Sequence, residues 1–439
     1  MRVAIDTLGC KVNQYETQAM EQLLRERGHE IAPFSGDADV YVINSCSVTA
    51  ASDHKSRQAV RRIRREHPEA LVALCGCYAQ THADEAHTLE ADVLSGSGDR
   101  QGFIRLLEQA WAGKQSRDPD AVRTPLESID VSAKRKQFET LPAGGLGART
   151  RAMLKVEDGC ANFCSYCIIP YARGPVRSMP LEEAAVQASK LAAEGYREIV
   201  VTGIEISSWG RELHIGLTLI DLLEIIRSAA PGVRIRLGSL EPRTITPEFC
   251  RRAAQIPELC PQFHLSLQSG CDATLKRMNR RYNTARYLES VAMLRESFRR
   301  PAITTDLITG FPGETEQEFQ DTLDFIRRCD FARMHIFPYS SRPGTPAAAM
   351  PQLPKEVREA RARRATAEAE QMRRAYLEGC TGEVHSVLFE QPRDGGFFGH
   401  AENYSGVLVQ DGNLRNQTRS VRITGTDGHI LFGELEARR

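Results

Sequence analysis

Short apolar runs alternate with helical patterns along most of the chain, and this alternation constrains the fold more than any other feature. In the first hundred residues, the runs at 3–8, 40–45 and 71–74 are each followed by a segment with helical periodicity. Repeated strand–helix units predict a parallel sheet with right-handed crossover connections. We therefore expect residues 1–112 to form a doubly wound α/β domain.

The same alternation resumes after residue 150. Helical segments separate six further apolar runs, which lie near residues 154–157, 198–202, 234–240, 262–267, 303–309 and 333–337. Six strand–helix units predict a partial (β/α)6 barrel over residues 150–378, with its chemistry in the loops after the carboxyl ends of the strands. Residues 113–149 have no strong period and contain several Pro and Gly residues, so we expect a linker there.

The chain changes character at residue 379. Short alternating stretches at 384–389, 406–409, 420–424 and 430–434 are separated by Asp-Gly and Gly-Gly turns. This pattern predicts a small antiparallel β-barrel over residues 379–439. Such a module either binds RNA or packs against a neighbouring domain. If it binds RNA, the candidate phosphate contacts are Arg415, Arg419 and Arg422.

Three cysteines stand close together in the sequence just after the first strand of the expected barrel. Cys160, Cys164 and Cys167 have the spacing Cys-x-x-x-Cys-x-x-Cys. Structural zinc takes four ligands, whereas a cubane iron–sulfur cluster can be held by three cysteines, which leaves one iron open for a small molecule. The alternative is a zinc site completed by a distant residue, but the motif contains no His and the next cysteine is Cys250. The spacing favours a [4Fe–4S] cluster.

Three more cysteines follow the three expected strands of the amino-terminal domain. Cys10, Cys46 and Cys77 come from distant parts of the sequence, but the carboxyl ends of parallel strands share one edge of the sheet, where ligands bind. A second site with three thiolates is therefore expected at this edge, with chance placement as the alternative. Cys75 complicates the count, because residues 75 and 77 of a strand point to the same face and periodicity cannot choose between them.

The overall charge limits how the chain can bind nucleic acid. It has 57 basic and 57 acidic residues, which argues against nonspecific coating of nucleic acid but allows local basic patches. One patch lies at residues 55–65, where Arg57 and Arg61 share a helical face and are candidate RNA contacts. A solvated helix face is an equal alternative.

The sequence also indicates in which cellular compartment the protein is expected. No stretch approaches the ~20 apolar residues of a membrane span, and the sequence opens with an apolar run that has no basic leader. We expect a cytoplasmic protein with no membrane partner. In a reducing compartment, its 12 cysteines are expected to be metal ligands and buried thiols rather than disulfides.

Several motifs resemble those of one known family. Residues 156–175, which begin Val-Glu-Asp-Gly-Cys and end Tyr-Ala-Arg-Gly-Pro, resemble the signature of radical S-adenosylmethionine (SAM) methylthiotransferases. Leu-Gly-Cys-Lys-Val-Asn-Gln-Tyr-Glu-Thr at 8–17 is similar to the opening of the branch that acts on threonylcarbamoyladenosine in tRNA. Asn-Ser-Cys-Ser-Val-Thr at 44–49 and Gly-Cys-Tyr-Ala-Gln at 76–80 resemble the other two amino-terminal cysteine motifs of the family.

The resemblance covers nearly the whole chain and implies an enzyme. It implies a carboxyl-terminal RNA-binding barrel of the TRAM type and two [4Fe–4S] clusters, one held by Cys160, Cys164 and Cys167 together with SAM. The other cluster would be held by Cys10, Cys46 and Cys77, because Cys77 rather than Cys75 stands in the motif of the family. SAM would serve as both radical source and methyl donor, and the six cysteines would be the catalytic centre. The product would be a methylthio group at C2 of N6-threonylcarbamoyladenosine (t6A) next to the anticodon.

The resemblance also implies partners and cofactor contacts. The partners would be the anticodon stem-loop of tRNA, a low-potential electron donor such as flavodoxin or ferredoxin, and a sulfur source. Each candidate contact to SAM or its cluster could instead be a structural residue; the candidates are Tyr166, Gly203, Ser239, Glu241, Gln268, Gly310 and Phe311. The sequence departs from the family pattern at Met179, Glu205 and Trp209, which puts fine substrate contacts in question.

Two alternatives remain at this point. One is the same chemistry on isopentenyladenosine in tRNA or on an aspartate of a ribosomal protein. The other is an RNA-binding protein that holds zinc and catalyses nothing. The residues Lys11 to Gln14 after Cys10 favour the threonylcarbamoyladenosine branch.

Overall fold

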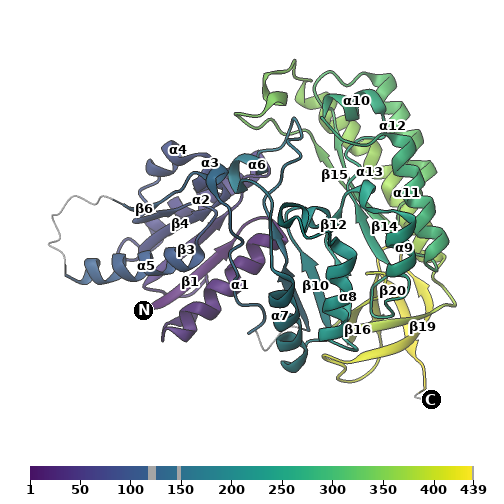
Figure 1. The fold of residues 1–439 in the computed structure, drawn as a ribbon, viewed down its shortest axis with the longest axis horizontal. Coiled ribbons are helices and arrows are strands. Elements are labelled where there is room, and N and C mark those ends of the chain that lie inside the picture. Colours follow the sequence, from purple (N-terminus) through teal and green to yellow (C-terminus); the bar gives the residue numbers. More distant parts are fainter. Residues whose placement is uncertain (117–124, 146–149, 438–439) are drawn as a thin grey trace.

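The amino-terminal part of the chain is a parallel sheet covered by helices on both faces. The computed structural model describes residues 1–116, 125–145 and 150–437 (Figure 1). The sheet has the strand order β2-β1-β3-β4-β5-β6, and its strands are β1 (Arg2–Thr7), β2 (Glu30–Ala32), β3 (Val40–Ser45), β4 (Leu71–Gly76), β5 (Val93–Ser95) and β6 (Leu126–Ser128). Its helices are α1 (Lys11–Glu26), α2 (Ala50–Glu66), α3 (Cys77–Thr81), α4 (Ala83–His87) and α5 (Arg100–Gln115).

Burial explains why this sheet is parallel. Every residue of β3 and β4 is buried, as expected for strands that are covered by helices on both faces. Separate hydrophobic clusters lie on the two faces. The predicted doubly wound domain is confirmed. β6 comes from the predicted linker and pairs with β5 as an edge strand; residues 117–124 and 146–149 of that linker lie outside the described residues.

The central part is an open barrel of parallel strands. Its strands are β7 (Arg151–Lys155), β10 (Glu198–Thr202), β11 (Arg234–Leu237), β12 (Ser239–Leu240), β13 (Gln262–Leu265), β14 (Ala302–Thr309) and β15 (Arg333–Pro338). They pair in the orders β11-β10-β7 and β12-β13-β14-β15, and a parallel bridge between Ile235 and Leu259 links the two groups. The predicted partial barrel is confirmed, with its strands close to the expected positions.

Helices cover the outside of the barrel, where the largest hydrophobic cluster lies. They are α7 (Leu181–Ala193), α8 (Leu219–Ala229), α9 (Pro247–Ala253), α10 (Asp272–Arg277), α11 (Thr284–Ser297), α12 (Glu316–Cys329) and α13 (Lys355–Glu378). Between β7 and α7, the strands β8 (Glu157–Asp158) and β9 (Arg177–Ser178) pair and flank the short helix α6 (Ile169–Arg173).

The carboxyl-terminal part is a closed barrel with the strand order β16-β17-β18-β20-β19. Its strands are β16 (Val384–Arg393), β17 (Gly396–Ala401), β18 (Gly406–Val409), β19 (Thr418–Thr426) and β20 (Leu431–Leu435). All neighbouring strands pair antiparallel except β18 and β20, which pair parallel. The predicted small barrel is confirmed and is consistent with a TRAM-like domain, except that one strand pair is parallel and that the sequence pattern did not reveal β17.

The carboxyl-terminal barrel docks at the end of the central barrel where the strands begin. Arg234 and Arg236 of β11 both pair with the buried Glu198 of β10. The same guanidinium groups donate to backbone carbonyls of the small barrel, at Ser386 over 2.9 Å and at Glu402 over 3.0 Å. This arrangement leaves the opposite end, where the strands finish, for the cysteine loop. Within the described ranges, no helix is both long and apolar enough to cross a bilayer.

Candidate functional site

The cysteines of the Cys-x-x-x-Cys-x-x-Cys motif lie between β8 and α6, at the carboxyl end of the first barrel strand. The N–H of Cys160 donates to the carbonyl of Gly174 over 3.0 Å, and that of Cys167 donates to the carbonyl of Cys164 over 2.9 Å. Gly159 has φ +86°, and a Cβ at this position would overlap the carbonyl of Pro175. The chain must therefore have glycine here to fold the loop back against residues 174–175.

Arg280 brings a positive charge to this first triad of thiols. Its Nη1 donates to Cys164 Sγ over 3.2 Å, and its Nε donates to the hydroxyl of Tyr282 over 3.0 Å. Burial, with a further contribution from Cys164, raises the pKa of Cys167 to about 12. Burial also raises the pKa of Cys160. Buried thiols of this kind become thiolates when a metal centre replaces their protons.

The amino-terminal cysteines form a second triad. Cys10 precedes α1, Cys46 follows β3, and Cys77 is the first residue of α3. Burial raises the pKa of Cys46 to about 12, and the neighbouring thiols Cys77 and Cys10 add to the shift. Gly9 has φ +103°, and a Cβ there would overlap Cys46 Sγ, so glycine allows the loop that carries Cys10 to approach Cys46.

Cys75 takes a different place from Cys77. It lies in the hydrophobic cluster on one face of the sheet, where its thiol faces the side-chain oxygen of Asn44 at 3.9 Å. In contrast, burial raises the pKa of Cys77, and the nearby charges of Arg173 and Cys10 shift it further in opposite directions. The geometry favours Cys77 as the third member of the triad.

The three sulfur atoms of neither triad lie as close together as the ligands of one zinc ion. Throughout the described ranges, the one group of Cys, His, Asp or Glu side chains with three ligand atoms within 4.8 Å of one another is Cys380, Glu383 and His385. The sulfurs of neither triad are that close together. Tetrahedral zinc, with Zn–S bonds of about 2.3 Å, needs its ligand atoms within such a distance, whereas a cubane spreads its iron atoms over several corners.

A buried network of charges joins the second triad to the central barrel. Glu16 of α1 pairs with Arg100, Lys155 and Arg173, and Asp158 pairs with Lys155, Arg173 and Arg177. All six side chains are at least nine-tenths buried. Four cations therefore surround two carboxylates, which leaves a net positive charge. The charge of Arg173 lies near Cys77 and acts to lower the pKa of its thiol. Such a surplus of positive charge suits an anionic group held by three thiolates.

The amino-terminal domain contacts both edges of the open barrel, on the side where the loops with the cysteines lie. On one edge, α3 with Cys77 packs against α6, which follows Cys167 (Figure 1). On the other edge, Arg342 in the loop after β15 pairs with Asp53 over 2.6 Å and donates to the carbonyl of Ser47 over 3.1 Å. Both contacts lie where strands end, so the carboxyl edges of the two sheets meet.

The predicted SAM contacts fall into two groups. Gly203, Ser239, Glu241 and Gln268 lie at the carboxyl ends of successive strands. A Cβ on Gly203 would come within 2.8 Å of the Glu157 carboxylate. Glu241 is buried and pairs with Arg243 over 2.8 Å, and Gln268 has φ +68°.

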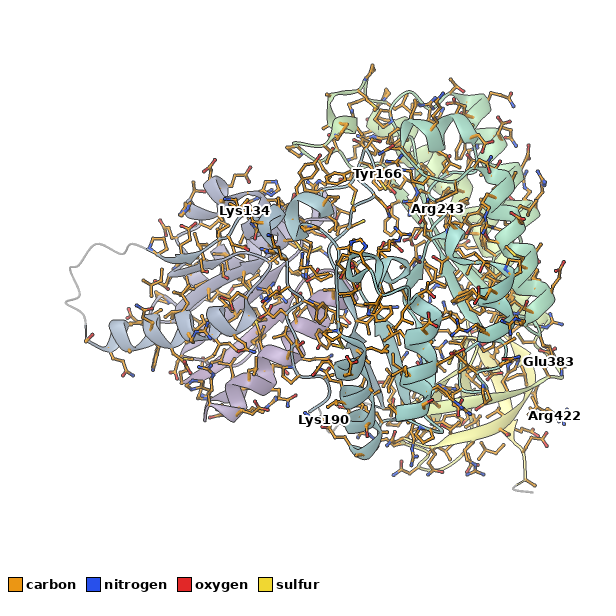
Figure 2. All side chains as sticks on the ribbon, viewed as in Figure 1. Lys134, Tyr166, Lys190, Arg243, Glu383 and Arg422 are labelled. Carbon is orange, nitrogen blue, oxygen red and sulfur yellow. The ribbon has the colours of Figure 1, made fainter. Side chains whose placement is uncertain are left out.

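The second group makes packing contacts; it consists of Gly310, Phe311 and Tyr166. A Cβ on Gly310 would overlap Arg358 of α13, so this glycine permits a close contact between helix and loop. Phe311 is fully buried between the rings of Tyr166 and Tyr339. Figure 2 labels Tyr166 and Arg243 in the upper part of the central barrel.

The predicted RNA contacts are spread over the surface. Arg57 lies over the ring of Tyr78 and pairs with Glu85, whereas Arg61 is exposed. In the small barrel, Arg422 pairs with Glu436 over 2.7 Å.

The other two arginines line cavities. Arg415 lines a cavity of about 450 Å³ where the three parts of the chain meet, together with Lys11, Arg151 and Tyr404. Arg419 lines a second cavity of about 780 Å³ between the two barrels. The first cavity lies toward the beginning of β7, so it is separate from the loop that carries the cysteines.

The departures from the family pattern lie beside one another. The indole N–H of Trp209 donates to the carbonyl of Met179 over 3.0 Å, and both side chains are buried in the same cluster. Glu205 accepts from Ser207 N–H and from the hydroxyl of Ser208.

Comparisons with known proteins agree with this arrangement. Residues 154–326 match the radical SAM superfamily, and residues 2–96 match the family described as uncharacterized protein family UPF0004. The chain is 38% identical to the threonylcarbamoyladenosine tRNA methylthiotransferase MtaB of Bacillus subtilis, over 93% of this chain and 90% of that protein. The chain belongs to the tRNA methylthiotransferase family.

Other members of the tRNA methylthiotransferase family match over similar lengths. The MtaB protein of Thermotoga maritima is 38% identical over 79% of this chain and 77% of its own. A tRNA-2-methylthio-N(6)-dimethylallyladenosine synthase of Symbiobacterium thermophilum is 31% identical over 99% of this chain and 94% of its own. The predicted family and its transferase class are confirmed.

A solved structure supports the fold. The radical SAM methyltransferase TsrM of Kitasatospora setae has a TM-score of 0.53 and 17% identity, over 79% of this chain and 73% of its own. As a member of the radical SAM superfamily, this methylthiotransferase uses a [4Fe–4S] cluster and SAM. The individual site residues, the domain limits and the second cluster stay predictions.

Sequence reasoning missed two parts of the site. One is Arg280, which lies 116 residues from the cysteine that it contacts and belongs to no recognisable motif. The other is the network around Glu16 and Arg173. Both of these residues stand inside the quoted family motifs, at 8–17 and 156–175. The signal available in the sequence was therefore an acidic residue in one motif and a basic residue in the other, which could form an ion pair.

Proposed function

We propose that this chain adds a methylthio group to C2 of t6A next to the anticodon of tRNA. The observation that supports the proposal is the contact of the amino-terminal domain with both edges of the barrel, which brings together the loops that carry the two sets of three cysteines. The MtaB names of the relatives at 38% identity favour t6A as the substrate. Dimethylallyladenosine is the second candidate, because relatives at 31–32% identity carry that name.

Cys160, Cys164 and Cys167 would hold the cluster that binds SAM, and Cys10, Cys46 and Cys77 would hold a second [4Fe–4S] cluster. When bound, the two clusters and SAM supply the radical and the sulfur. The protein positions these groups. Arg280 hydrogen-bonds a ligand sulfur of the first site, and Arg173 directs positive charge to Cys77 of the second.

The charged network has a further part in this scheme. Glu16 fixes Arg100, Lys155 and Arg173 on its two oxygens, so the cations cannot swing away from the second site. Because the network joins α1 to β7 and α6, it also sets the distance between the two sites. An electron donor such as flavodoxin or ferredoxin and a source of sulfur complete the reaction.

Mass spectrometry of nucleosides tests the proposed substrate. The enzyme, reconstituted without oxygen, is incubated with transcripts that are unmodified, carry t6A or carry dimethylallyladenosine. We expect the methylthio product only on the t6A transcript. Product only on the dimethylallyladenosine transcript would assign the chain to the other branch. 5′-Deoxyadenosine with no methylthio nucleoside on any of the three would overturn both assignments.

A further inference from the structure

Three potential metal ligands meet at the start of the small barrel, far from either cysteine triad. Cys380 follows the end of α13, Glu383 precedes β16, and His385 is the second residue of that strand. One ligand atom from each lies within 4.8 Å of the other two. Figure 2 shows Glu383 on the small barrel near Arg422, well away from Tyr166. This group is therefore separate from the site described above.

The imidazole of His385 is held as a metal ligand is usually held. Its Nδ1 donates to Glu402 Oε1 over 2.8 Å, from the turn between β17 and β18. A histidine that binds a metal commonly gives its other N–H to a carboxylate, which fixes the tautomer and the orientation of the ring. This contact leaves Nε2 of His385 as the nitrogen that can coordinate.

Nε2 of His385 is buried and faces the carboxylate of Glu383. The side chain is only 7% exposed, and its Nε2 has no hydrogen bond to any described residue. It faces Glu383 Oε2 at 3.4 Å. A buried polar atom without a hydrogen bond is unfavourable, and a bound cation would remove this penalty.

The side chains of Glu383 and Cys380 are also positioned to bind a metal ion. Glu383 Oε1 accepts from Arg300 Nε over 3.1 Å, which leaves Oε2 on the side of His385. The fully buried thiol of Cys380 receives the side-chain N–H of Asn403 at 3.9 Å. Access exists as well, because His385 and Glu402 line the cavity of about 780 Å³ between the two barrels.

We propose that Cys380, Glu383 and His385 bind one zinc ion. A thiolate, an imidazole and a carboxylate are a donor set typical of zinc, whereas calcium and magnesium prefer oxygen ligands alone. A water molecule or another small ligand would take the fourth position. The ion would tie the end of α13 to β16, and through Glu402 to the turn before β18. It would thereby hold the small barrel on the helix that leads into it.

Zinc K-edge X-ray absorption tests the site in the presence of the iron clusters, because the method is specific to the element. The full-length enzyme, reconstituted without oxygen, is given one equivalent of zinc and passed over a desalting column. We expect retained zinc with one sulfur at about 2.3 Å and the remaining N or O ligands at about 2.0–2.1 Å. A shell of about three sulfurs would place the zinc in a cysteine triad and overturn the proposal. So would loss of the zinc on the column.

Variants connect the zinc to these residues. Cys380→Ala should lose the zinc, and Cys329→Ala, which changes another fully buried cysteine in α12, should keep it. Glu402→Gln should still fold and should weaken zinc binding about 10–100-fold in competition with a chelator, because it replaces the carboxylate that orients His385. Equal zinc affinity in the wild type and Glu402→Gln would contradict the proposed role of His385. None of these readouts depends on the tRNA substrate.

Discussion

Lys155 Nζ, at the end of the first barrel strand, lies 3.0 Å from Glu16 Oε1 in the first helix of the amino-terminal domain. Both side chains are 1% exposed. This ion pair joins the two parts of the chain that carry the cysteine triads. The position of one triad relative to the other therefore depends on a buried electrostatic contact as well as on apolar packing.

Replacing Glu16 tests this junction. Glu16→Gln should lower the free energy of unfolding by about 3–5 kcal/mol, because it leaves buried cations without their carboxylate. Glu368→Gln, which removes the partner of Arg327 on an exposed face, should cost at most about 1 kcal/mol. Urea denaturation measures both. Equal, small losses would show that the network contributes little to stability.

Acid should weaken the same junction. Burial alone would raise the pKa of Glu16, but the charges of Arg173, Lys155 and Arg100 outweigh burial and lower it to about 2. The free carboxyl group of an unfolded chain titrates near pH 4.3. The stabilisation is therefore complete above about pH 4.3 and is lost as the pH falls toward about 2.

Near-UV circular dichroism during acid titration follows this loss. The wild type should lose tertiary structure progressively across this interval. Glu16→Gln has no such group, so its remaining stability should change less between the same two pH values. Identical acid profiles of the two proteins would contradict the assignment.

Arg280 should tune the first cluster. Removing a positive charge and a hydrogen bond from a ligand sulfur disfavours the reduced cluster, so Arg280→Met should make its reduction potential more negative. Arg281→Met, at the exposed neighbour, is the control and should leave the potential unchanged. Redox titration followed by electron paramagnetic resonance gives both values. A shift of the same size in both variants would mean that the contact with Cys164 is not responsible.

Two arginines of the small barrel should contribute to tRNA binding. Arg415 and Arg419 line cavities between domains. Each Ala variant should weaken tRNA binding and should lower the slope of log affinity against log salt concentration by the amount expected for about one phosphate contact. Arg422 lines neither of these cavities, so Arg422→Ala should have a smaller effect. Affinities measured at several salt concentrations separate the three variants. An unchanged salt slope for Arg415→Ala and Arg419→Ala would point to a purely structural barrel.

The sequence predicted the architecture because long parallel strands carry a strong apolar signal. Runs such as β3 and β4 are mostly apolar and buried throughout, and the helices after them have a clear period. The strands that escaped notice carry little signal of this kind. β2 and β5 have three residues each, and β17 begins Gly-Phe-Phe-Gly without alternation.

The site was only partly predictable for a different reason. Cysteine spacing marks the ligands within one loop, but the contacts that support them join distant parts of the chain. Arg342 meets Asp53 across 289 residues, and Arg173 meets Glu16 across 157. Such contacts arise from how the amino-terminal domain docks on the barrel, which periodicity and composition do not encode.

The central claim is that two separate three-thiol sites serve one reaction. The most direct test is the variant in which Cys10, Cys46 and Cys77 are all changed to Ala, reconstituted and given SAM, a reductant and t6A-containing tRNA. The wild type should hold about eight irons per chain and the variant about four. The variant should still form 5′-deoxyadenosine but no methylthio nucleoside. Methylthiolated tRNA from the variant, or an unchanged iron content, would contradict the account.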